Sequence, residues 1–97
     1  MNTSHYFSKS DAQRIHAKRR FMQRKQIDFN RQLRRHVISM IRNNHARLVQ
    51  KTSNRVSVWD VLVLGTPCRV VYDSKRGNIV TVLPGKVESR EQRGFIL

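Results

Sequence analysis

The sequence changes character near residue 46, and this division limits the folds that the chain can adopt. Residues 10–45 are dominated by charged and helix-forming residues, whereas residues 47–83 contain short runs of Val, Ile, Leu and Thr separated by turn residues. The first composition favours helices and the second favours strands. We therefore expect a single α+β domain over residues 10–84, in which two N-terminal helices pack on an antiparallel sheet of three or four strands. Residues 1–9 are expected to be a flexible N-terminus and residues 85–97 a C-terminal tail.

Apolar residues at helical spacing predict where the two helices lie. The first is expected from Asp11 to Lys25, with Ala12, Ile15 and Met22 on its apolar stripe. Phe21 lies across this helix from Ile15, where it could seal against a second layer or a partner. The second helix is expected from Asp28 or Asn30 to about Asn44, and its predicted apolar face consists of Leu33, Val37, Met40 and Ile41.

Alternating apolar residues predict the strands. A change of parity in the second strand indicates a bulge or a strand covered on both faces. We expect a hairpin turn at residues 65–67 and a charged turn at residues 73–77. With helices on one face of the sheet, the other face would be open to a partner. The predicted strands are Arg47–Lys51, Val56–Leu64, Cys68–Tyr72 and Ile79–Leu83.

The charge balance predicts a polyanionic partner. Lys and Arg total 20 against six Asp and Glu, which gives a net charge of +14. Most of these cations are Arg, which binds phosphate oxygens in a bidentate way. RNA is therefore the expected partner, with DNA as the alternative. Between Phe29 and Lys51 the chain has no acidic residue, so this stretch is unlike an ordinary solvated helix face. The residues expected to bind nucleic acid are Arg24, Arg31, Arg34, Arg35, Arg42, Arg47, Lys51, Lys75 and Arg76.

The remaining composition argues against metal and cofactor chemistry. The single cysteine, Cys68, cannot form an internal disulfide, and the histidines are scattered without acidic or thiol neighbours at ligand spacing. We expect no metal and no cofactor. No apolar run is long enough to span a membrane, and the first ten residues lack the apolar core of a signal peptide. The expected location is the cytoplasm of a bacterial or phage-infected cell.

The cationic and proton-transferring residues suit one reaction, metal-independent cleavage of RNA. In that reaction a 2′-OH attacks the adjacent phosphate, which requires a base, an acid and cations around the developing charge. His16 could move the proton, because its ordinary pKa lies near neutrality. Arg20 and Arg24 could hold the phosphate, although they could equally pin the helix to the sheet. Arg69 would face the open side of the sheet and contact phosphate if Tyr72 faces the helices.

Two aromatic residues leave alternatives open. Tyr72 could stack on a base or transfer a proton, or it could fill the rim of the core. Trp59 could stack on a base, but a lone Trp in a small domain is more often part of the core. Lys75 and Arg76 at a turn could contact phosphate or be solvated.

The first predicted helix contains the pattern His-Ala-x-x-Arg-x-x-x-Arg, in the segment His16-Ala17-Lys18-Arg19-Arg20-Phe21-Met22-Gln23-Arg24. Ile27 follows this pattern, and the paired segments 69–73 and 78–83 come later. In these features the chain resembles a group of small proteins of bacterial mobile elements and phages related to the RelE and BrnT ribonuclease toxins. The resemblance implies N-terminal helices on a curved antiparallel sheet with RNA bound across the sheet. It also implies a possible endoribonuclease with His16, Arg20, Arg69 and Tyr72 as catalytic residues.

Three functions follow as hypotheses. The first is an RNA-binding protein without catalysis, such as a phage factor or a ribonucleoprotein component. The second is a metal-independent endoribonuclease of the toxin kind. The third is a module that binds an acidic protein, such as an antitoxin, and it is compatible with the second.

Overall fold

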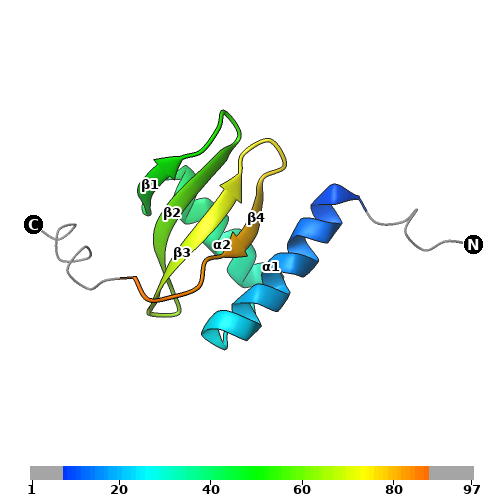
Figure 1. Cartoon of the computed structure of the whole chain (residues 1–97), viewed down its shortest axis with the longest axis vertical. Coiled ribbons are helices and arrows are strands. Elements are labelled where there is room, and N and C mark those ends of the chain that lie inside the picture. The colour runs from blue at the N-terminus through cyan, green and yellow to red at the C-terminus, as the bar shows by residue number, and fades with distance from the viewer. Residues whose placement is uncertain (1–7, 88–97) are drawn as a thin grey trace, which may run out of the picture.

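The computed structural model describes residues 8–87 and consists of two helices followed by a four-stranded antiparallel sheet (Figure 1). The strand order in the sheet is β1-β2-β3-β4, so each strand pairs with the next along the chain. The expected α+β class, with the helices before the strands, is confirmed. Expectations for residues 1–7 and 88–97 lie outside the described residues. The elements are α1 (Lys9–Lys25), α2 (Arg31–Arg42), β1 (Arg47–Lys51), β2 (Val56–Val63), β3 (Thr66–Asp73) and β4 (Asn78–Val82).

A capping box starts α1 two residues earlier than predicted. The Ser8 hydroxyl accepts a hydrogen bond from the backbone N–H of Asp11, and the Asp11 carboxylate accepts one from the backbone N–H of Ser8. These bonds satisfy N–H groups that have no partner within the helix. They also lower the pKa of the Asp11 carboxyl group. The helix ends at Gln26, which adopts a left-handed conformation with φ 55°.

The predicted apolar stripe of α1 is wrong. Ile15 and Met22 are 45% and 51% exposed, whereas Ala17 and Phe21 are fully buried. Phe21 stacks on Phe29 with ring centroids 4.0 Å apart, so the residue expected to seal a second layer is part of the core. The predicted stripe consisted of apolar side chains, but the buried side of α1 also carries polar groups that bind the sheet. One of them is Arg24, for which a contact between the helix and the sheet was one of the two expectations.

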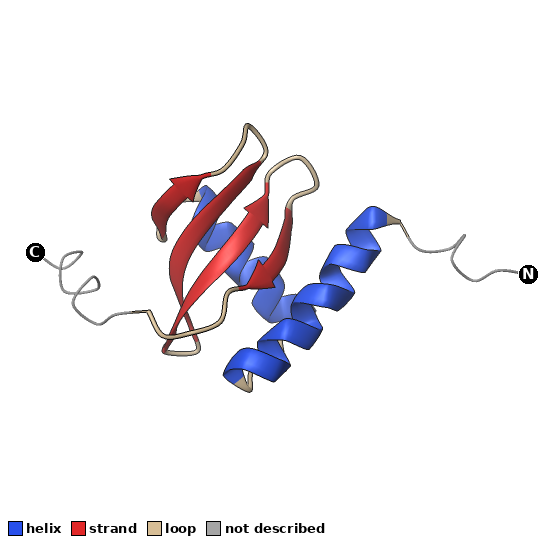
Figure 2. Cartoon of the chain, in the orientation of Figure 1, coloured by secondary structure: helices blue, strands red, loops and turns tan. Residues whose placement is uncertain are grey.

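Those polar groups fix α1 along β4, the edge strand (Figure 2). Asn78 Nδ2 donates to Gln13 Oε1 over 3.1 Å. Arg24 Nη1 donates to the carbonyl oxygen of Val82 over 2.7 Å. The buried Ala17 lets the helix approach closely, because its side chain is a single methyl group. As a result, α1 covers an edge that would otherwise present unpaired backbone groups.

The second helix covers one face of the sheet. Asn30 caps α2 by accepting a hydrogen bond from the backbone N–H of Leu33 over 2.9 Å. Val37 and Ile41 are buried against strand residues, and Figure 1 shows α2 behind the sheet. The core residues that the strands contribute are Val61, Val63, Cys68, Val70, Tyr72, Ile79 and Val82.

The strand boundaries differ from the prediction at the β2–β3 turn. Leu64 and Gly65 both have positive φ, at 51° and 76°, which forms a two-residue hairpin turn. β3 therefore begins at Thr66, so Gly65 lies in the turn as expected, whereas Thr66 and Pro67 belong to the strand. A bulge was one of the two expectations for β2, but β2 pairs with β3 without a shift of register. The register shifts lie between Leu48 and Gln50 of β1 and, in the β3–β4 pair, between Val71 and Tyr72.

Candidate nucleic-acid interface

A basic groove of about 370 Å³ lies between α1, α2 and the β3–β4 turn. Arginines dominate its walls, and no Asp or Glu lines it. We call it the arginine groove. It is lined by Arg14, Arg34, Arg35, Ile38, Ser39, Arg42, Arg76, Gly77 and Asn78.

Crowding of like charges is visible at Arg34, which lies on the groove side of α2. Partial burial, followed by the positive charges of Arg14, Arg31 and Arg35, lowers the pKa of its guanidinium group. Arginine nevertheless stays protonated at any physiological pH. Within residues 8–87, neither Arg34 nor Arg35 has a carboxylate within ion-pair distance. The groove therefore holds positive charge that the described part of the chain does not neutralise.

The other arginines of the groove are held in place by neighbours. Arg14 forms an ion pair with Asp11, one turn away on α1. Arg42, at the end of α2, donates from Nε to the hydroxyl oxygen of Tyr72 over 3.2 Å. A Cβ atom added at Gly77 would lie 3.1 Å from Nη2 of Arg42, and Gly77 has φ 65°. Glycine therefore allows both the turn and the close approach of the guanidinium group.

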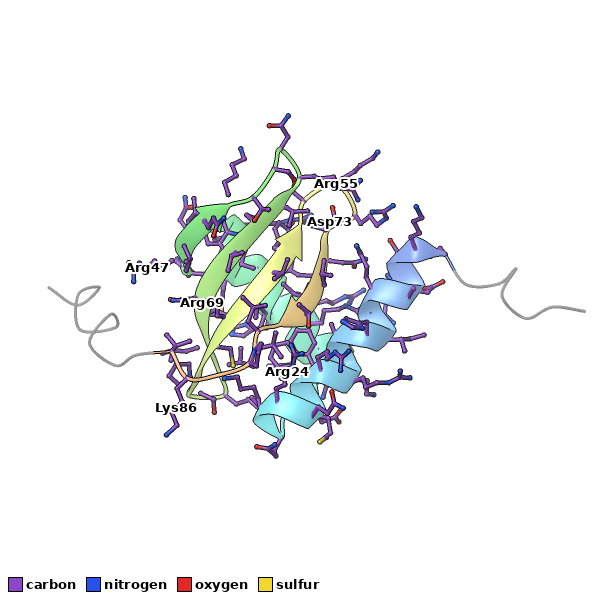
Figure 3. All side chains as sticks on the ribbon, viewed as in Figure 1. Arg24, Arg47, Arg55, Arg69, Asp73 and Lys86 are labelled. Carbon is purple, nitrogen blue, oxygen red and sulfur yellow. The ribbon has the colours of Figure 1, made fainter. Side chains whose placement is uncertain are left out.

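Asp73 connects the elements that carry these cations. Its side chain is 2% exposed and accepts hydrogen bonds from Gln13, Arg55 and Arg76 over 3.0, 2.7 and 3.1 Å. Its other oxygen accepts from the backbone N–H groups of Lys75 and Arg76. Burial alone would raise the pKa of Asp73, but the hydrogen bonds and the charge of Arg55 outweigh it and lower the pKa. Figure 3 shows Arg55 and Asp73 together at one end of the sheet.

A second groove, of about 460 Å³, lies between the end of α2 and the loop joining β1 to β2. We call it the tryptophan groove, because it contains Trp59, the only Trp of the chain. Trp59 Nε1 donates to Ser57 Oγ over 2.8 Å, which fixes the indole ring. Arg42 lines this groove as well as the arginine groove. Its lining is Ile41, Arg42, Leu48, Lys51, Ser53, Asn54, Arg55, Val56, Ser57, Trp59, Tyr72 and Ser74.

The nine residues expected to bind nucleic acid are thus divided among several places. Arg34, Arg35, Arg42 and Arg76 meet in the arginine groove, and Lys51 joins Arg42 in the tryptophan groove. The remaining four lie elsewhere: Arg24 on the β4 edge, Arg31 at the start of α2, Arg47 on β1 and Lys75 at the exposed β3–β4 turn.

The residues expected to be catalytic are not brought together. Tyr72 is buried on the helix side of the sheet, and its hydroxyl group bonds to Arg42. Arg69 lies on the opposite face, where its Nε and Nη2 donate to the two carboxylate oxygens of Asp60 over 2.7 and 2.9 Å. His16 and Arg20 lie on α1, and Arg20 bonds to Gln23. Tyr72 and Arg69 therefore cannot act on one phosphate from their present positions.

His16 retains one property suited to proton transfer. Partial desolvation and the nearby charges of Arg20, Arg24 and Arg19 lower its pKa below the usual 6.5. The shift favours the neutral imidazole, which is the form that can accept a proton.

Three residues of the interface were missed from the sequence. Arg14 is a groove residue on α1, whereas the sequence analysis selected Arg20 and Arg24 of that helix. Arg55 and Asp73 are separated by 18 positions, and only the antiparallel pairing of β2 with β3 brings them together. A helical wheel centred on Ala17 and Phe21 would have placed Arg14 next to the buried side of α1, but no sequence signal identifies the Asp73 cluster.

A third cavity is lined mainly by apolar side chains, although Arg47 and Asp60 also contribute to it. It measures about 650 Å³, and its lining includes Met40, Val61 and Cys68. Burial raises the pKa of the Cys68 thiol to about 11, so the thiolate that a nucleophile requires is scarce at neutral pH.

Within residues 8–87, no three His, Cys, Asp or Glu side chains come close enough to hold a metal ion. No helix in the same range has the length and apolar character needed to cross a membrane.

Comparison with known proteins gives no match. No protein-family model matches the sequence, and neither a curated protein nor a solved structure is significantly similar to it.

Proposed function

We propose that this protein binds RNA through phosphate contacts in the arginine groove. The observation that carries the proposal is the convergence of Arg14, Arg34, Arg35, Arg42 and Arg76 on one groove whose lining has no carboxylate. Guanidinium groups in such a setting bind phosphate oxygens and release the counterions of a nucleic acid. The net charge of +14 adds attraction at longer range.

The shape of the groove supports RNA over double-stranded DNA. Readout of the DNA major groove uses a helix that projects from the protein surface. Here the arginine side of α2 is a wall of a groove, flanked by α1 and by the β3–β4 turn. A flexible or irregular RNA can enter such a recess more readily than a straight duplex.

The first test measures how the affinity for a short labelled RNA depends on salt concentration. The logarithm of the association constant should fall linearly with the logarithm of salt, by about 0.7 to 0.9 for each phosphate contact. The double variant Arg34→Gln/Arg35→Gln should bind more weakly and reduce the slope by about 1.5. Binding that is insensitive to salt would rule out the proposal.

A matched control separates the groove from total charge. Lys18→Gln/Arg19→Gln removes the same formal charge from exposed positions of α1 outside the groove. This control should retain most of the affinity. Equal losses in the two double variants would mean that only net charge matters and that the groove is not the binding site.

A metal-independent endoribonuclease is the second candidate, because His16, Arg20 and Arg24 lie one turn apart along α1, where a proton-transferring group stands beside two cations. Incubating RNA with the protein in EDTA and mapping the ends of the products tests this reaction. Cleavage should be lost in His16→Ala if His16 transfers the proton, and Arg69→Ala should reduce cleavage if Arg69 contacts phosphate. This candidate is excluded if the RNA stays intact with the wild-type protein, or if both variants cleave RNA as fast as the wild type does.

An acidic protein partner, such as an antitoxin, would compete for the same cations. RNA binding and partner binding would then be mutually exclusive at the arginine groove. A pull-down after nuclease treatment that recovers one acidic protein, and fails with Arg34→Gln/Arg35→Gln, is the expected result for this arrangement.

A further inference from the structure

We propose that the tryptophan groove accepts an unpaired base of single-stranded RNA, with the base stacked on Trp59. This inference rests on the proposed function, because it takes the RNA backbone to be held in the arginine groove. It adds the class of nucleic acid, namely single-stranded RNA, and a base-binding site.

The two grooves are neighbours that share one wall. Arg42 lines both of them. Its Nε donates to the Tyr72 hydroxyl group, which belongs to the tryptophan groove. Nη2 of the same guanidinium group lies close to Gly77, which belongs to the arginine groove. A phosphate bound at Arg42 would therefore place its nucleoside beside the tryptophan groove.

Asp73 fixes the two grooves relative to each other. It binds Arg55, which lines the tryptophan groove, and Arg76, which lines the arginine groove. Because one buried carboxylate holds both cations, the distance between the two grooves is set by the fold rather than by mobile side chains.

The lining of the tryptophan groove suits a base. Bases in single-stranded RNA stack on aromatic rings and form hydrogen bonds through their free edges. The partly exposed Trp59 supplies the ring, and Ser53, Asn54 and Ser74 supply polar groups around it. The volume of about 460 Å³ lies within the range typical of small-ligand sites.

Base pairing would prevent this contact. In an A-form duplex the bases are stacked on each other, and side chains reach mainly the backbone and the shallow groove. Insertion of a paired base would require its extrusion, which costs several kcal/mol. The inference therefore predicts a preference for single strands that the arginine groove alone would not produce.

The intrinsic fluorescence of Trp59 reports on the site in the unmodified protein, because the chain contains one Trp. The experiment titrates the protein with four probes: single-stranded RNA, an abasic oligonucleotide of the same length, the corresponding RNA duplex and inorganic polyphosphate. Binding of each probe is measured separately by calorimetry. The expected result is that all four bind and that only single-stranded RNA strongly quenches the fluorescence.

The outcomes distinguish this inference from the proposed function. Binding of all four probes without quenching would overturn the base site and leave phosphate binding intact. Equal quenching by the abasic oligonucleotide, the duplex or polyphosphate would also overturn it. Failure of every probe to bind would overturn the proposed function, and this inference with it.

A variant provides a second measurement. Trp59→Phe keeps an aromatic ring at a position that packs beside the core, but it reduces the stacking area. Its affinity for single-stranded RNA should fall about fivefold, with unchanged affinity for polyphosphate. Circular dichroism and the unfolding midpoint establish that the variant is folded. An unchanged affinity for single-stranded RNA in the folded variant would contradict the inference.

Discussion

Arg34 and Arg69 are both partly exposed arginines, but their surroundings on the two sides of the sheet differ. Arg34 lies in a groove with other arginines and has no carboxylate partner within residues 8–87. Arg69 binds both oxygens of the buried Asp60 carboxylate. For this reason the proposed RNA site is placed at Arg34 rather than at Arg69: within residues 8–87, only Arg34 of the two lacks a carboxylate partner.

The largest expected effect comes from reversing the unpartnered charges. Arg34→Glu/Arg35→Glu should lower the affinity for RNA by about 100-fold, because two phosphate contacts are replaced by repulsion. Fluorescence anisotropy at fixed salt measures the change, and circular dichroism checks the fold. The control is the same charge reversal at Lys18 and Arg19. If the control lowers the affinity for RNA more than Arg34→Glu/Arg35→Glu does, the groove binds RNA no better than the rest of the surface.

The next effect concerns the buried carboxylate that organises the groove. Asp73→Asn should lower the free energy of unfolding by about 2 kcal/mol at pH 7, because a buried, multiply hydrogen-bonded charge is lost. Urea denaturation measures the change. Equal stability of variant and wild type would show that Asp73 does not organise the fold.

The same residue makes a prediction about pH. The pKa of Asp73 is lowered in the folded protein from its ordinary value of 3.8, so its contribution is present above that value and is lost as the pH falls through the folded pKa. The difference in stability between wild type and Asp73→Asn should therefore shrink below about pH 4. A difference that stays constant with pH would contradict this assignment.

Substitution of Arg69, which is paired with Asp60, should lower stability rather than the affinity for RNA, in contrast to substitution of Arg34. Arg69→Met should cost about 1 to 2 kcal/mol in stability, because it removes a bidentate pair from the Asp60 carboxylate, which is 3% exposed. Its affinity for RNA should change less than about threefold. Adding Asp60→Leu should restore part of the stability, because an apolar pair can replace a buried ion pair. A large loss of affinity without loss of stability would instead place Arg69 in the RNA site.

The smallest expected effect is at the tip of the β3–β4 turn. Lys75 is exposed and does not line the arginine groove, although its neighbour Arg76 does. Lys75→Gln should change the affinity for RNA by less than about twofold, whereas Arg76→Gln should weaken binding several-fold. If the two substitutions lower the affinity for RNA equally, the turn contributes only general electrostatic attraction and Arg76 makes no specific contact.

The class and order of the elements could be predicted from the sequence because propensity and apolar spacing are local properties. α2 illustrates this, since its buried Val37 and Ile41 belong to the predicted apolar face. α1 could not be oriented in the same way, because it packs against the edge of a strand and uses Gln13 and Arg24 for the contact. Apolar spacing contains no information about such polar contacts.

The interface was predictable in part for a similar reason. The absence of acidic residues identified the arginines of α2, and three of them line the arginine groove. Whether a given arginine has a carboxylate partner depends on strand register, as in the pairing of Asp60 opposite Arg69. That information exists only once the sheet has formed.

The position of α1 on β4 affects the order in which the fold can form. The first helix of the chain rests on its last strand, and the bond from Arg24 to Val82 joins residues 58 positions apart. Such distant contacts carry a high entropic cost of loop closure and slow the folding of small domains. During synthesis α1 emerges first but cannot dock until the sheet is complete. Docking of the N-terminal helix is therefore expected to be the last step of folding, and a chain stopped before β4 would leave Phe21 exposed and prone to aggregation.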